Sequence, residues 1–172
     1  QAEIPFIRLR SGLPENLLKG NKSFSETISL ARKATENPSL LIEPKRRLIT
    51  INGEQARLSP LHMLLLLWTA WRMKSGKGPI PTLVDGEKNH HYASELFEIA
   101  EHFWLEINSR SRNPLEKNGV TKSFLEENIS RLNSSIQETI GNDLANLCKL
   151  AVIKNEHGSG YALPSNLDIV IR

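Results

Sequence analysis

The sequence predicts an α+β fold dominated by helices, and three observations indicate it. Residues 48–58 contain two β-prone segments joined by an Asn-Gly turn. Apolar residues then recur at helical spacing over residues 60–74, 92–109 and 121–140. A second pair of short β-prone segments follows these helices. Strands grouped near the two ends, with helices grouped between them, are typical of α+β domains.

Residues 1–39 are expected to form a connector and a docking helix, and residues 40–172 a single domain. Pro5 and Pro14 disfavour a long helix near the start, because proline lacks the backbone N–H group that a helix uses. A short helix with a serine N-cap is predicted to follow and to end before Pro38.

The hairpin is predicted to lead directly into a core helix. Asn52-Gly53 is a strong hairpin signal, since both residues tolerate positive φ angles. The second strand ends at Leu58, and Ser59 can cap a helix whose first residue is Pro60. Apolar residues cover more than half of this helix, which therefore belongs at the centre of the core. They are Leu64, Leu65, Leu67, Trp68 and Trp71.

The remaining elements are predicted from breakers and periodicity. Residues 76–92 are polar and contain two prolines, so a long loop is expected. A helix over residues 92–109 follows, and Asn113-Pro114 is expected to interrupt the chain. The third long helix covers residues 121–140. A helical turn at 143–148, two strands at 149–154 and 160–163, and a closing strand at 167–171 complete the domain.

This order of elements is that of a winged helix-turn-helix with an N-terminal β-hairpin and a C-terminal wing. Two phrases, Leu58-Ser59-Pro60 and Gly158-Ser159-Gly160-Tyr161-Ala162-Leu163, resemble the OmpR-type arrangement. In that type a strand ending in Leu-Thr/Ser-Pro leads into the first core helix, and Gly-x-Gly-Tyr-x-Leu forms the second strand of the wing. One interpretation is therefore the DNA-binding effector domain of an OmpR-type transcription factor.

A narrower resemblance covers more of the chain. A CRISPR-associated family is similar to this chain in Ile4-Pro5-Phe6-Ile7-Arg8-Leu9-Arg10, the predicted helix around Phe24, the hairpin and Leu58-Ser59-Pro60. It is also similar in Ser130-Arg131-Leu132-Asn133 and the Gly-Tyr wing sequence. In that family a CARF domain, a sensor of cyclic oligoadenylates, precedes a winged-helix-like C-terminal module. The resemblance implies that Gln1 lies just after such a sensor. It also implies a non-catalytic module that couples ligand sensing to duplex DNA binding or to assembly of a homodimer.

DNA binding would use the third long helix and the wing, because a winged helix places that helix in the major groove and the wing beside the phosphates. The candidate contacts are Lys122, Arg131, Asn133, Gln137, Lys154 and His157. The same helix also carries Glu126, Glu127 and Glu138. A role in the core or in a dimer interface is the competing interpretation.

The densest basic cluster lies elsewhere, at Lys45, Arg46 and Arg47, with Arg57 also in the hairpin. These side chains could meet phosphates, although a solvated hairpin end is the commoner explanation. The net charge of +3 comes from the first third of the chain: residues 1–60 hold 10 Lys and Arg against 6 Asp and Glu, whereas residues 122–172 hold 5 against 6.

Enzymatic and metal-binding interpretations have less support. Arg57 and His62 have the Arg-x-x-x-x-His spacing of HEPN ribonucleases, but a strand-to-helix junction separates them and His62 is expected in a buried, structural position. A CRISPR effector ribonuclease is thus a third hypothesis. The adjacent His90-His91 pair lacks partners at ligand spacing, so neither a metal nor a cofactor is expected. Cys148 is expected to pack as a small apolar residue.

The tryptophans and the apolar segments complete the predictions. Trp68, Trp71 and Trp104 are expected in the core, with one of them partly exposed at a partner surface. The longest apolar segment, residues 61–71, is too short to span a bilayer, and no signal peptide is visible. A cytoplasmic location without membrane contact is therefore expected.

Overall fold

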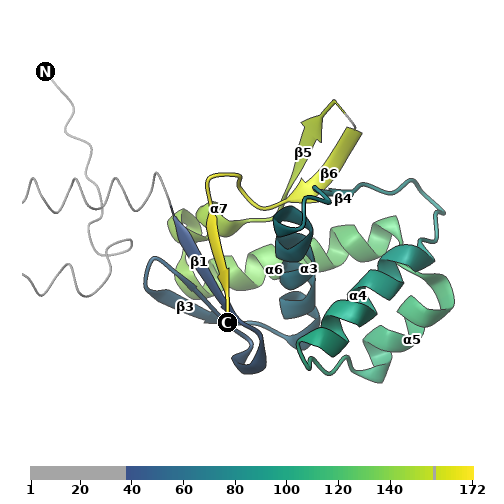
Figure 1. Ribbon diagram of the computed structural model, residues 1–172, viewed down its shortest axis with the longest axis horizontal. Coiled ribbons are helices and arrows are strands. Elements are labelled where there is room, and N and C mark those ends of the chain that lie inside the picture. Colours follow the sequence, from purple (N-terminus) through teal and green to yellow (C-terminus); the bar gives the residue numbers. More distant parts are fainter. Residues whose placement is uncertain (1–37, 157) are drawn as a thin grey trace, which may run out of the picture.

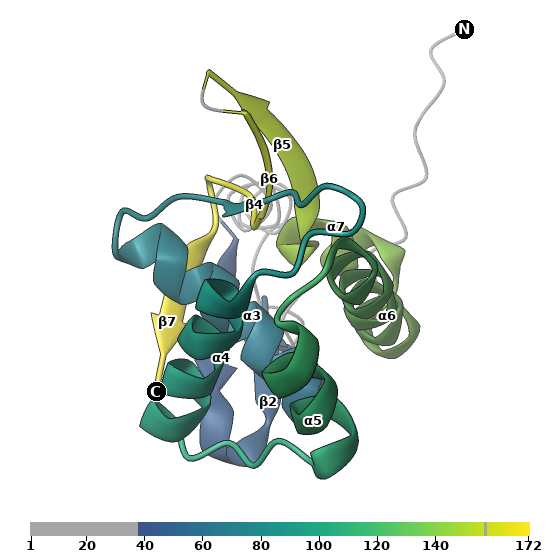
Figure 2. The ribbon, with the colours of Figure 1, turned by 90° about the vertical axis from the view of Figure 1, so that its right-hand side faces the viewer.

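The computed structural model describes residues 38–156 and 158–172 and confirms an α+β fold, with helices between two small sheets (Figures 1 and 2). The connector and docking helix predicted before residue 38, and His157, lie outside the described residues. The α-helices of the described part are α3 (Pro60–Lys74), α4 (His90–His102), α5 (Ser109–Asn118), α6 (Lys122–Ile140) and α7 (Asn142–Cys148).

The first sheet has the strand order β3-β2-β1-β7. Its strands are β1 (Ser39–Glu43), β2 (Leu48–Ile51), β3 (Glu54–Arg57) and β7 (Asp168–Ile171), and a short 3-10 turn, η1 (Pro44–Arg46), follows β1. The predicted hairpin is confirmed: φ is 48° at Asn52 and 95° at Gly53, as a tight turn of this kind requires. The closing strand β7 lies parallel to β1.

The second sheet has the order β4-β6-β5 and is built from β4 (Ile80–Pro81), β5 (Ala151–Asn155) and β6 (Gly158–Ala162). The hairpin β5–β6 was predicted, whereas β4 lies inside the segment predicted as a loop. A Cβ atom at Gly160 would lie 2.7 Å from Pro79 Cβ and 2.8 Å from the Ile80 carbonyl oxygen. Glycine at this position therefore allows β4 to approach β6.

Helix α3 occupies the centre of the fold, as predicted. Ser59 caps it, since its Oγ accepts a hydrogen bond of 3.2 Å from the His62 N–H, and Pro60 is the first helical residue. All residues from Met63 to Ala70 are buried, because α4 and α6 both pack against this helix. A helix covered on several sides needs apolar residues around most of its circumference, which explains the leucine run.

The predicted helix over residues 92–109 is wrong in its C-terminal part. Helix α4 ends at His102, because Trp104 adopts a left-handed conformation with φ of 56°. The predicted break at Pro114 is also wrong, since Pro114 lies inside α5. Proline removes one helical hydrogen bond, but the Asn108 cap and the buried Leu115 hold this short helix in place.

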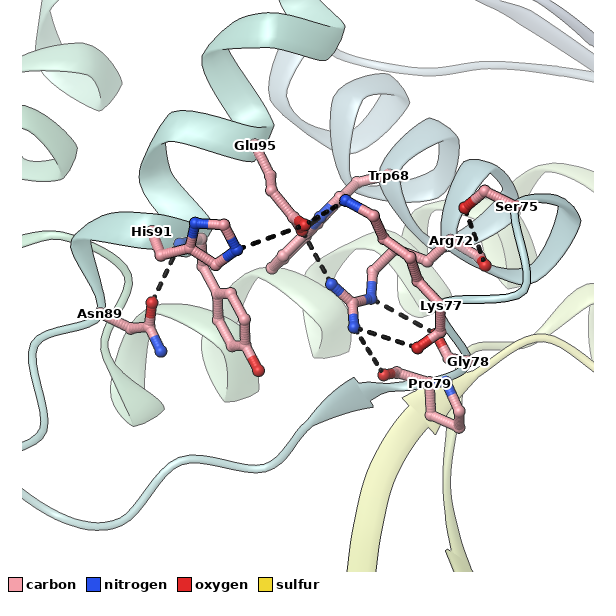
Figure 3. A network of polar contacts seen from close by, with 10 residues as sticks. Trp68, Arg72, Ser75, Lys77, Gly78, Pro79, Asn89, His91 and Glu95 are labelled. Carbon is pink, nitrogen blue, oxygen red and sulfur yellow. Dashed lines mark hydrogen bonds and ion pairs between the residues drawn. The ribbon is translucent and has the colours of Figure 1, made fainter. Parts of the chain in front are cut away.

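A buried carboxylate joins α3 to α4 (Figure 3). Glu95 of α4 is buried, and its Oε2 accepts hydrogen bonds of 2.8 Å from both Trp68 Nε1 and Arg72 Nη1. Its Oε1 accepts a hydrogen bond of 2.9 Å from Lys77 Nζ. The Trp68 ring also packs edge-on against Tyr92, at 5.4 Å between ring centroids.

Arg72 extends this network to the chain that enters β4. Its Nη2 donates to the carbonyl oxygens of Lys77 (3.3 Å) and Pro79 (3.4 Å), and its Nε donates to that of Gly78 (3.3 Å). Three consecutive carbonyl groups are therefore held by one guanidinium group immediately before β4. The Glu95 network, defined as Trp68, Arg72, Lys77 and Glu95, thus sets where the second sheet meets the helices.

The ionisation of Glu95 couples this network to pH. Burial is the largest single influence and would raise the pKa of the carboxyl group, but hydrogen bonds from Lys77, Trp68 and Arg72 together outweigh it and lower the pKa to about 2. A pKa below the ordinary value of 4.5 means that ionised Glu95 stabilises the folded state above pH 4.5. This contribution is lost as pH falls from 4.5 towards 2.

We predict that Glu95→Gln lowers the free energy of unfolding at neutral pH by about 3 kcal/mol, because Arg72 loses its buried counter-charge. The variant should also lose less stability than the parent protein between pH 5 and pH 2.5. Urea denaturation followed by circular dichroism across this pH range measures both effects.

Glu98→Gln is the matched control, since Glu98 is an exposed carboxylate on the same helix. It should change stability by less than about 0.5 kcal/mol at neutral pH. Equal pH dependence in Glu95→Gln and the parent protein would contradict the account of the network.

Candidate nucleic-acid interface

The two cations of α6 are both engaged with carboxylates. Lys122 Nζ lies 3.1 Å from Asp85 Oδ1, and the hydrogen bond to Asp85 raises the pKa of Lys122. Arg131 forms an ion pair with Glu127, one helical turn away. Both pairs are exposed to solvent, so they are weak and a phosphate group could compete for either cation.

The side-chain amide of Asn133 is hydrogen-bonded to the protein backbone. Its Nδ2 donates to the Leu150 carbonyl oxygen at 2.9 Å, and its Oδ1 accepts from the Leu150 N–H at 3.1 Å. This double hydrogen bond fastens the segment between α7 and β5 to α6. An amide used in this way is not available to hydrogen bond a base edge, whereas Gln137, one turn further along, is exposed.

The exposed side of α6 is slightly acidic. Besides Lys122 and Arg131 it carries Glu126, Glu127 and Glu138, all three of them exposed. Three carboxylates against two cations oppose insertion into the major groove, where the phosphates of both strands are close.

The hairpin β5–β6, which was predicted as a wing, contributes one described cation, Lys154, which is exposed on β5. The predicted contact His157 lies outside the described residues. The two residues before Lys154 are apolar and exposed: Val152 is 49% exposed and Ile153 is 42% exposed. Strand β5 is an edge strand, so its outer backbone groups do not pair within the sheet.

The basic cluster lies at the opposite end of the described structure from the β5–β6 hairpin. Lys45 and Arg46 belong to η1, and Arg47 follows it, at the ends of β1 and β2. In Figures 1 and 2 this turn lies near the bottom of the view and the β5–β6 hairpin lies at the top. The structure therefore separates the basic cluster from Lys154 of the β5–β6 hairpin.

Two further cations lie at this end of the sheet. Arg57 of β3 is paired in register with Leu48, and the Leu58 N–H donates to the Arg47 carbonyl oxygen at 2.8 Å. The Arg172 N–H donates to the Ile42 carbonyl oxygen at 3.0 Å. We use the term "basic end" for Lys45, Arg46, Arg47, Arg57 and Arg172. Four of these residues form the basic cluster predicted from the sequence, and the parallel pairing of β7 with β1 adds Arg172.

Of the described histidines and the cysteine, His62 and Cys148 are the least exposed. His62 is half-buried rather than buried, and burial followed by the charge of Arg131 lowers its pKa, so the neutral form is favoured. Burial raises the pKa of the Cys148 thiol to about 12, so it stays protonated. Within residues 38–156 and 158–172, no group of three or more His, Cys, Asp or Glu side chains could hold a metal ion.

A helix that crosses a bilayer needs about 20 consecutive apolar residues. No helix in the described ranges combines that length with sufficient apolarity. Comparison of the chain with models of protein families, with curated proteins and with solved structures gave no match.

We predict that Asn133→Ala destabilises the fold by about 1–3 kcal/mol, because Leu150 loses two hydrogen bonds in a partly buried site. Gln137→Ala, on the exposed side of the same helix, should change stability by less than about 0.5 kcal/mol. Urea denaturation of both variants measures the difference. Equal stability of the two variants would show that the Asn133 contact contributes nothing to folding.

Proposed function

We propose that this chain is a non-catalytic module of the winged-helix type in a CRISPR-associated regulatory or accessory protein, and that it acts by pairing with a second copy of itself. The order α3, β4, α4, α6 and β5–β6, with the sheet order β4-β6-β5, supports the winged-helix part of this proposal. The sequence resemblance described above supports the CRISPR-associated part.

The contacts and charge of α6 favour a role of the module in assembly over a role in binding duplex DNA. Its two cations are paired with carboxylates, its exposed side carries an excess of negative charge, and Asn133 holds the backbone of Leu150. A helix that enters the major groove needs unengaged donors facing the bases and positive charge facing the phosphates. We therefore assign α6 to the core of the module.

The observation that carries the assembly proposal is the apolar outer edge of β5. Val152 and Ile153 are neighbours, so their side chains point to opposite faces of the sheet, and both are more than 40% exposed. An edge strand with apolar side chains on both faces is a template for another strand. A second β5, running antiparallel, satisfies the unpaired backbone groups and covers the same residues on both copies.

A groove beside β5 extends this surface. It has a volume of about 580 Å³ and is lined mainly by apolar groups. Ile153 and Ala151 line it from β5, with Met73 from α3 and Pro79 from the segment before β4. Because Arg72 holds the Pro79 carbonyl group, the groove is tied to the Glu95 network. The resemblance implies a sensor domain upstream of this module. We propose that a change in the arrangement of two such sensor domains alters the pairing of the two β5 edges.

The test is the mass of the chain in solution. We predict that sedimentation velocity of the 172-residue chain shows a mass that rises with concentration from 19.4 kDa towards twice that value. The double variant Val152→Asp/Ile153→Asp should stay monomeric at every concentration, because apposed carboxylates repel each other across an antiparallel pair.

Val84→Asp is the matched control, since Val84 is 69% exposed in the loop between β4 and α4. It should associate as the parent chain does. A monomeric parent chain, or a double variant that still associates, contradicts the proposal. Duplex DNA binding that is lost in Arg131→Ala would instead favour the OmpR-type interpretation, and RNA cleavage that is lost in His62→Ala would favour the ribonuclease.

A further inference from the structure

Trp104 is placed where a tryptophan is doubly unfavourable. It is 84% exposed to solvent, so a large aromatic surface stays in contact with water. Its backbone also has a φ of 56°, in the left-handed region that residues other than Gly, Asn and Asp rarely adopt. Features of this kind gather at sites of function, where the strain serves a purpose outside the fold.

The backbone around Trp104 explains its conformation. The Leu105 N–H donates to the Ala100 carbonyl oxygen at 2.8 Å, and the Trp104 N–H donates to that of Glu101 at 3.2 Å. This pair of hydrogen bonds is the Schellman motif, in which the residue at the position of Trp104 is usually glycine. Buried Leu105 anchors the motif, so the indole ring is held outside the core on a fixed backbone.

The indole ring borders a groove that also contains basic residues. The groove has a volume of about 430 Å³, within the range of ligand-binding sites. Lys45 and Arg47 line it on the side of the first sheet, and Trp104 and Asn108 line it on the side of the chain between α4 and α5. It therefore combines one exposed aromatic ring with two cations from another part of the sequence.

The charge around this groove is positive. The five cations of the basic end lie at the adjoining ends of β1, β2, β3 and β7. Two carboxylates oppose them: Glu43 pairs with Arg46 at 3.1 Å, and Glu106 lines the groove. Lys45 and Arg47 are the cations that line the groove itself, where they are available to an anionic ligand.

We propose that Trp104, Lys45 and Arg47 form a binding site for single-stranded nucleic acid. An unpaired base stacks on the Trp104 ring, and Lys45 and Arg47 contact the flanking phosphates. Aromatic stacking with a cationic groove is the general mode by which proteins hold single strands. Bases in a duplex are stacked on each other, so a single exposed indole ring selects an unpaired one.

This site is independent of the pairing proposed for β5, because the basic end and the wing lie at opposite ends of the molecule (Figures 1 and 2). Either proposal can fail without affecting the other. The surface at the basic end also remains accessible in a dimer that pairs through β5.

The test is the binding of an oligouridylate of about 12 nucleotides, followed by fluorescence anisotropy of a labelled strand at low ionic strength. Trp104→Gly should weaken binding at least about tenfold, since stacking on one aromatic ring has that magnitude. Its melting temperature should be no lower than that of the parent chain, because glycine suits the left-handed position.

A second variant, Lys45→Ala/Arg47→Asn, tests the phosphate contacts without touching the tryptophan. Asparagine is chosen at position 47 because Arg47 has a φ of 53°. The slope of log Kd against log salt concentration should fall by about 1.4, or about 0.7 for each lost contact. Lys154→Ala is the control: it removes a cation at the wing and should leave affinity unchanged.

Three results would overturn the proposal. The first is no binding of the single strand at low ionic strength. The second is unchanged affinity in Trp104→Gly, which would mean that the indole ring does not stack. The third is an equal loss in Lys154→Ala and Lys45→Ala/Arg47→Asn, which would mean that binding follows net charge alone.

Discussion

The ion pair between Arg72 and Glu95 is the interaction on which the arrangement of the two sheets depends. A buried ion pair stabilises a fold only when all of its hydrogen-bonding groups have partners. Here the Arg72 side chain donates hydrogen bonds to Glu95 and to three backbone carbonyl groups. The Glu95 carboxylate also accepts hydrogen bonds from Trp68 and Lys77. The chain before β4 is consequently held against the end of α3, and β4 is presented to β6. The apolar groove beside β5 follows from the same contacts.

Local signals in the sequence predicted the elements that local chemistry determines. Asn52-Gly53 specifies a hairpin and Ser59-Pro60 a helix start, because in each case adjacent residues set their own backbone angles. Strand β4 could not be predicted, since it has two residues and depends on Arg72 and Gly160. The end of α4 was also missed, because its signal is a buried leucine that anchors a strained tryptophan, and no glycine marks the position.

In the candidate site, too, the sequence identified the residues but not the contacts that they make in the fold. The sequence identified the cations, but it could not show that Lys122 meets Asp85, 37 positions away, or that Asn133 holds Leu150. The pair of Glu127 and Arg131 is different, because its i,i+4 spacing is visible in the sequence. Lys45 and Arg47 come from the turn after β1, and Trp104 comes from the chain between α4 and α5. The fold brings these separate segments to one groove.

The two ends of the described structure thus have different chemistry: one has the apolar edge of β5, and the other has an aromatic ring among cations at the far end of the first sheet. We have proposed that the outer edge of β5 binds a second copy of the chain. Hydrogen–deuterium exchange at increasing chain concentration tests it most directly. If two β5 edges pair, the amides of β5 become protected as concentration rises, while those of α6 and η1 do not change. Protection that is independent of concentration at β5, or that appears on α6 instead, would contradict it.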